Sequence, residues 1–177
     1  MNQKICITWN VRGLGSLEKK ASTKRLIRCS KTSVLFIEET KIQKCDDWVI
    51  RQIVGSNGNF IWAFAPAVGL SGGLLSIWDP EVFECQTQVI QRNYIILIGC
   101  LTMQHIKLQC TLINVYGPNG VTERRMVFND LCETLSNLQF PILMGGDFNI
   151  VCRREEKLGA SERKGEMKDF GNFINSL

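Results

Sequence analysis

An apolar run near the C-terminal third of the chain, Pro141–Met144, leads through two glycines into Asp147 and Asn149. Side chains alternate across an extended chain, so a carboxylate and an amide at this spacing project to the same side. Such a pair could bind a cation or orient a phosphate. Aspartate and asparagine are also common in turns, where they hydrogen-bond the local backbone, and the pair alone leaves both interpretations open.

Three further polar groups follow apolar runs. Asn10 ends an alternating segment, the pair Glu38-Glu39 follows Val34–Ile37, and Tyr116 ends another apolar run. Strand ends along one edge of a sheet are where α/β proteins build sites. Carboxylates and amides without cysteine or histidine suit a hard cation such as Mg²⁺, with Mn²⁺ as a second candidate. These residues predict metal-assisted hydrolysis of a phosphodiester.

Hydrophobic periodicity predicts the elements that must position these groups. Helical spacing predicts helices over residues 17–30, 45–54 and 122–138 and a last helix around Met167–Ile174. Strands are expected over residues 4–10, 34–37 and 141–149, and five short runs between residues 60 and 116 predict a meander of antiparallel hairpins. The chain shows no repeat or linker, so we expect one α/β domain.

A glycine loop before the first predicted helix suggests a dinucleotide-binding turn. Gly13 and Gly15 match the first two glycines of that fingerprint, but Glu18 stands where the third glycine packs the helix against the strand. The sequence therefore does not favour dinucleotide binding.

Composition and charge narrow the class of protein. The 177 residues are 45% hydrophobic and 21% charged, which is typical of a globular domain. The net charge is +4, whereas residues 12–31 hold seven basic residues and one acid, a local +6. This segment favours a polyanionic partner, or it forms a solvated helix face.

Cysteine and histidine usage argues against a zinc site. The eight cysteines form no CxxC pair, and the single histidine, His105, lies in a predicted hairpin turn where we do not expect a catalytic role. Free thiols in a reducing compartment are expected. The longest apolar run, Tyr94–Leu101, is far shorter than the roughly 20 residues that cross a bilayer, so we expect a soluble, intracellular protein.

Five blocks along the chain resemble the endonuclease/exonuclease/phosphatase superfamily, with the fold of DNase I and exonuclease III. The closest resemblance is to the endonuclease domain of plant LINE-type (non-LTR) retrotransposons. It implies a two-sheet, four-layer α/β sandwich over residues 1–177. The blocks, in the family's order, are WNVRGL at 9–14, LFIEETK at 35–41, GLSGGL at 69–74, NVYGP at 114–118 and GGDFN at 145–149.

The resemblance also implies roles for single residues. Asn10 would orient the site and share the metal ion with Glu39, and Asp147 would orient or deprotonate the attacking water. Tyr116 and Asn149 would contact the phosphate. Arg12 and Lys41 are candidate nucleic-acid contacts, and the family usually has glutamine where this chain has Glu38, which we expect at a solvated strand end.

The family's domain continues with another strand pair, an arginine-containing segment and a final Ser-Asp-His motif, and none of these follows Asn149 here. The resemblance therefore implies a sandwich that is incomplete at the C-terminus and weak or absent activity in this chain. DNA is the expected partner, with RNA as an alternative, and the nucleus is the expected compartment. Two other functions stay open: a non-catalytic nucleic-acid-binding module that uses residues 12–31, and a phosphatase of the same superfamily.

Overall fold

The computed structural model describes all residues except 1–3, 56–58, 70, 105 and 157–163. His105, which the sequence placed in a hairpin turn, lies outside the described residues. The chain divides into two compact units. The first comprises Met1–Tyr116 and Phe140–Asp147, and the second comprises Gly117–Gln139 and Phe148–Leu177.

The first sheet of the first unit has the strand order β1-β2-β4-β3. β1 runs parallel to β2, and the other two pairings are antiparallel. β2 is a central strand and is buried along its whole length, which matches its continuous apolar sequence. The strands are β1 (Ile5–Asn10), β2 (Thr32–Glu38), β3 (Ile61–Ala65) and β4 (Leu74–Trp78).

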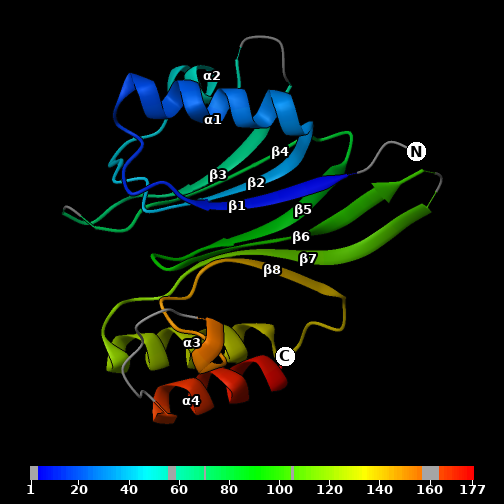
Figure 1. Cartoon of the computed structure of the whole chain (residues 1–177). Coiled ribbons are helices and arrows are strands. Elements are labelled where there is room, and N and C mark those ends of the chain that lie inside the picture. Colours follow the sequence, from blue (N-terminus) through cyan, green and yellow to red (C-terminus); the bar gives the residue numbers. More distant parts are fainter. Residues whose placement is uncertain (1–3, 56–58, 70, 105, 157–163) are drawn as a thin grey trace. The chain divides into compact units, whose positions relative to one another are not determined.

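Two helices, α1 (Leu17–Ser30) and α2 (Asp47–Val54), cover one face of this sheet (Figure 1). Each begins at a residue whose side chain accepts a backbone N–H of the first turn, Ser16 for α1 and Asp46 for α2. The apolar sides of both helices pack on the sheet in a cluster that includes Ile27, Ile53, Leu35 and Ile77.

The second sheet of the first unit packs on the other face of the first sheet (Figure 1). Its order is β5-β6-β7-β8, antiparallel except for the parallel pair β7 and β8. Gly145 lies where the sheets approach closely, because a Cβ there would sit 3.2 Å from the Phe36 ring. The strands are β5 (Phe83–Ile90), β6 (Tyr94–Met103), β7 (Ile106–Tyr116) and β8 (Ile142–Asp147).

The second unit consists of α3 (Val121–Leu135), the short 3₁₀ helix η1 (Arg154–Glu156) and α4 (Lys164–Asn175). Phe128 on α3 stacks on Phe173 of α4 with 4.4 Å between ring centroids. The buried guanidinium of Arg124 donates to the carbonyl oxygens of Pro118 and Asn119 and pairs with Glu166. The unit is therefore held by an aromatic cluster and one buried ion pair.

The structure confirms the α/β sandwich with two sheets and the helices predicted from periodicity. The predicted single meander between residues 60 and 116 is wrong in one respect, since β3 and β4 belong to the first sheet and β5–β7 to the second. All eight cysteines are free. Across the described ranges, no helix is long and apolar enough to cross a membrane.

Candidate active site

Parallel strand pairing places four polar strand ends at one edge of the first unit. Asn10 and Glu38, the last residues of β1 and β2, stand opposite each other in the register of the first sheet. Tyr116 and Asp147, the last residues of β7 and β8, do so in the second. Parallel strands that end in register deliver their following side chains to the same edge.

Hydrogen bonds join these ends into one network. The Asn10 amide nitrogen donates to Oε1 of Glu39 at 3.0 Å and to Oδ2 of Asp147 at 2.6 Å. The Tyr116 hydroxyl donates to the same Glu39 oxygen at 3.3 Å. The structure thus brings together Asn10, Glu39, Tyr116 and Asp147, four of the five residues that the sequence predicted for the core of the site.

Backbone hydrogen bonds hold the loop that carries Glu39. The Gly13 and Leu14 amides donate to the carbonyls of Glu39 and Thr40, at 2.7 and 2.8 Å. On the other side, the Thr40 and Lys41 amides donate to Gly73 and Gly72, at 3.0 and 3.1 Å. Glu39 itself has φ +52°, so the chain turns at this residue and its side chain leaves the alternation of β2.

Position 73 requires glycine because the Thr40 side chain lies close to its backbone. It has φ +86°, and a Cβ there would lie 2.4 Å from the Thr40 hydroxyl oxygen. The GLSGGL block therefore has a structural role at the site, since it supports the Glu39 loop with its backbone.

Glu38 does not lie at a solvated strand end, as the sequence had suggested. It is 1% exposed and accepts a hydrogen bond from the Thr8 hydroxyl at 2.7 Å. Alternation along β2 puts it on the side of Phe36, between the two sheets, because β2 is covered on both faces up to its last residue. Burial raises the pKa of Glu38 to about 8, with a further contribution from the charge of Asp147.

Asn149 does not continue the strand that ends at Asp147. β8 stops there, and Asn149 has the left-handed φ of +53°, so the expected alternation of Asp147 and Asn149 on one strand is wrong. Asn149 belongs to the second unit, where its side-chain amide donates to the Gly117 carbonyl at 2.8 Å. The sequence did not distinguish a strand that continues to Asn149 from a turn after Asp147, because two glycines followed by Asp-Phe-Asn are compatible with either.

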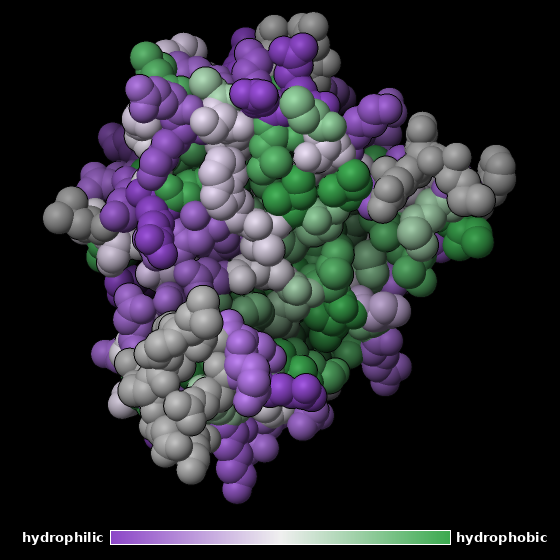
Figure 2. Space-filling view, in the orientation of Figure 1, coloured by the Kyte–Doolittle hydropathy of each residue, from purple (hydrophilic) through white to green (hydrophobic). Residues whose placement is uncertain are grey.

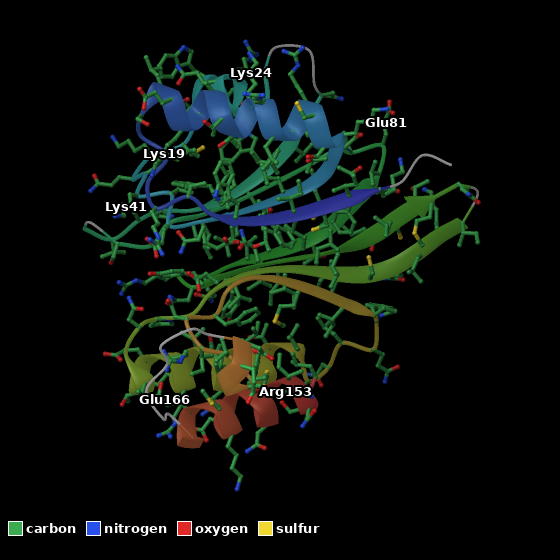
Figure 3. The ribbon with its side chains drawn as sticks, in the orientation of Figure 1. Lys19, Lys24, Lys41, Glu81, Arg153 and Glu166 are labelled. Atoms are coloured by element: carbon green, nitrogen blue, oxygen red, sulfur yellow. The ribbon has the colours of Figure 1, made fainter. Side chains whose placement is uncertain are left out.

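Two basic residues flank the network in sequence. Arg12 donates its backbone N–H to Oδ1 of Asn10 at 3.1 Å, which fixes the amide orientation. Lys41 follows the Glu39 turn and lies beyond the end of β2 in Figure 3. Lys19 was missed by the sequence analysis; its ammonium donates to the carbonyls of Val11 and Arg12 at 2.6 and 2.9 Å and so secures the loop after Asn10.

The donor set fits a hard divalent cation. Glu39 accepts hydrogen bonds from the amide of Asn10 and the hydroxyl of Tyr116, which hold its carboxylate in place. Mg²⁺ is commonly held by one or two carboxylates and waters, so a dedicated cage is not needed. No group of three histidine, cysteine or acidic side chains that could hold a metal ion is found among the described residues.

Comparison with solved structures identifies the fold. An AP endonuclease from Archaeoglobus fulgidus superposes with a TM-score of 0.73 at 13% identity, over 98% of this chain and 70% of that one. The AP endonuclease LMAP from Leishmania major gives 0.67 at 18% identity, over 97% and 66%. TDP2 from D. rerio, complexed with a single strand DNA product, gives 0.55 at 16% identity, over 82% and 60%.

The chain therefore has the DNase I-like α/β sandwich fold and spans about two thirds of the length of these endonucleases. The sequence matches no protein-family model, and a search of curated proteins finds no significant match. The likeness at this level of identity concerns the fold, and the chemistry has to be argued from the site.

Proposed function

We propose that this chain carries a nucleic-acid phosphodiesterase site that hydrolyses DNA with Mg²⁺, with Mn²⁺ as an alternative ion. The observation that supports the proposal is the network in which Asn10 hydrogen-bonds both Glu39 and Asp147 while Tyr116 hydrogen-bonds Glu39. Two carboxylates, an amide and a phenol gathered at the ends of parallel strands suit an anionic substrate that arrives with a divalent cation.

Glu39 and the oxygen of Asn10 would hold the cation. When bound, such an ion neutralises charge on the phosphate and lowers the pKa of a coordinated water. Asp147 accepts the proton of the attacking water, whose oxygen forms the new bond to phosphorus as the bond to the leaving oxygen breaks, and the leaving oxygen takes up a proton from solvent. Tyr116, held by Glu39, presents its hydroxyl to a phosphate oxygen, and the role of Asn149 at the phosphate stays a prediction.

The proposed lineage follows from the five sequence blocks. We assign the chain to the endonucleases of LINE-type retrotransposons, which nick one strand of chromosomal DNA, and this activity would place it in the nucleus. Two of the blocks contain Asn10 and Glu39, a third contains Tyr116 and a fourth contains Asp147. The superposed AP endonucleases and TDP2 support a nucleic-acid substrate over other phosphoesters.

The test is plasmid nicking by the purified chain. Supercoiled DNA is incubated with Mg²⁺, with Mn²⁺ and with EDTA, and the open-circular product is followed with time. We expect weak nicking that requires the metal and that Asp147→Ala abolishes. Equal activity of Asp147→Ala and the unaltered chain would refute the assignment, as would activity that persists in EDTA.

A further inference from the structure

A basic surface lies on α1, away from the strand ends that form the candidate active site. It lines a cavity of about 540 Å³. Lys24, Arg28 and Lys31 form its cationic part. A neighbouring cavity of about 430 Å³ shares Lys24 and Arg28 and adds Arg25, so the two form a basic groove along α1.

Lys24, Arg28 and Lys31 differ from Lys19 and Lys20, which have partners within the protein. Lys19 is bound to backbone carbonyls, and Lys20 donates to Gln52 at 2.6 Å and lies over the Trp48 ring. The ion pairs found in the described part of the chain join other residues: Lys107 with Glu84, Arg124 with Glu166 and Arg125 with Asp169. Within the described residues, therefore, no ion pair involves Lys24, Arg28 or Lys31.

Asp79 is the acidic residue that lines the larger cavity. Its carboxylate accepts the backbone N–H of Glu81 at 2.9 Å, so it closes its own turn. Three cations and one acid give the lining a net charge of +2. Many side chains over α1 in Figure 2 are hydrophilic, and Figure 3 shows Lys24 on this helix.

Other residues give the larger cavity an apolar part. Ile27, Val54 and Phe60 line it, and Thr32 contributes a buried hydroxyl oxygen that has no hydrogen-bond partner among the described residues. A lining that combines apolar and aromatic side chains with cationic ones matches a nucleotide, whose base is apolar on its faces and whose phosphate is anionic.

We propose that this groove on α1 binds one nucleotide of a single-stranded nucleic acid, with its phosphate against Lys24, Arg28 and Lys31 and its base against Phe60. Thr32 begins β2 and Glu39 follows its end. At about 3.3 Å per residue, the seven residues of this strand separate the groove from the candidate active site by roughly 20 Å. The groove is therefore a separate binding site, and its existence does not depend on the proposed hydrolysis.

Binding of a fluorescein-labelled oligothymidylate of about 12 nucleotides tests the proposal. Fluorescence anisotropy is recorded in EDTA over a range of salt concentrations, so that hydrolysis does not contribute. The variant Lys24→Gln/Arg28→Gln/Lys31→Gln is compared with Lys4→Gln/Arg92→Gln/Lys168→Gln, which removes the same number of lysines and arginines from exposed positions elsewhere. Circular dichroism melts establish that both variants are folded.

The groove variant is expected to bind at least about tenfold more weakly than the control variant. It should also lower the slope of log affinity against log salt by about 0.7, the contribution of one neutralised phosphate on a single strand. Equal affinities and slopes in the two variants would show that the oligonucleotide is attracted by the net charge of the protein and not by the groove, and would overturn the proposal.

A second variant tests the base contact. Phe60→Leu keeps an apolar side chain but removes the ring, and we expect roughly fivefold or greater weakening with an unchanged salt slope. Unchanged affinity would refute the base contact. Oligonucleotide binding in EDTA and plasmid nicking are separate measurements, so failure of the nicking assay and failure of the groove can be told apart.

Discussion

The hydroxyl of Tyr116 donates a hydrogen bond to Oε1 of Glu39 over 3.3 Å, although the two residues are 77 positions apart in the chain. Tyr116 ends a strand of the second sheet and Glu39 follows a strand of the first. The bond therefore joins the two sheets at the edge where the site lies, and it holds the carboxylate in a fixed direction.

Removing this hydrogen bond should lower activity without unfolding the protein. In Tyr116→Phe the ring remains, but Glu39 loses one of its two donors. A hydrogen bond to a charged group is worth about 1.5–3 kcal/mol, so we expect a nicking rate lower by about 10- to 100-fold. Single-turnover nicking measures it, and a melting curve that stays near that of the unaltered chain serves as the control. An unchanged rate would contradict a positioning role for Tyr116.

The two carboxylates should differ in their response to metal concentration. Glu39→Gln should raise the Mg²⁺ concentration needed for half-maximal nicking at least about tenfold, because the ligand charge is lost. Asp147→Asn should lower the maximal rate about 10²- to 10⁴-fold while leaving the metal requirement nearly unchanged. Mg²⁺ titrations of the nicking rate distinguish them, and Glu84→Gln, an exposed carboxylate paired with Lys107, is the matched control. Identical titration profiles for both site variants would argue against separate roles.

The buried carboxyl of Glu38 should make stability fall as pH rises. Below its ordinary value of 4.5 the group is neutral in both states. Between 4.5 and its raised pKa of about 8, the unfolded chain releases the proton that the folded chain keeps, so the free energy of unfolding decreases through this window. Above pH 8, Glu38 is ionised in the folded and the unfolded chain, and the free energy of unfolding does not decrease further through this group.

Glu38→Gln removes that titration and keeps an oxygen for the Thr8 hydroxyl. The variant should therefore gain stability relative to the unaltered chain as pH rises, by up to a few kcal/mol at pH 8.5 compared with pH 5. Urea denaturation in EDTA at both pH values measures the difference. Glu84→Gln should show no such trend, and a stability difference that is independent of pH would contradict the buried position of the charge.

Two glycines should respond oppositely to substitution. Gly146 has φ +145°, and a Cβ there would lie 1.9 Å from the Val115 carbonyl oxygen, so Gly146→Ala should cost several kcal/mol or prevent folding. Gly171 lies within α4 with nothing within 4 Å of its added Cβ, and Gly171→Ala should stabilise by about 0.5–1 kcal/mol. Thermal melts compare the two, and equal tolerance would count against the tight strand junction at Gly146.

Local patterns predicted most elements, since apolar spacing and capping residues act over a few positions. Ser16 before α1 and Asp46 before α2 are examples of signals that lie within the segment they start. The strand-end residues Asn10, Tyr116 and Asp147 were predictable for the same reason. Their meeting required the parallel register of β1 with β2 and of β7 with β8, which no local pattern specifies.

The misplaced residues were those whose positions depend on distant partners. Glu38 looked exposed because glutamate usually is, yet β2 is covered from both sides and Thr8 supplies its donor. Asn149 was expected to continue β8. Its left-handed backbone instead takes it off the strand, and its side chain bonds to Gly117, 32 positions away, which no local pattern specifies. Lys19 looked like one more surface charge, although its ammonium binds the loop after Asn10.

The loop that carries Glu39 is fixed by main-chain donors and acceptors on both sides, from Gly13 and Leu14 and from Gly72 and Gly73. Such bonds do not depend on the identity of most side chains along the loop. A side-chain change at Lys41 or Ser71 is therefore expected to leave the Glu39 carboxylate in place. Gly73 is the exception, because a Cβ there would meet the hydroxyl oxygen of Thr40.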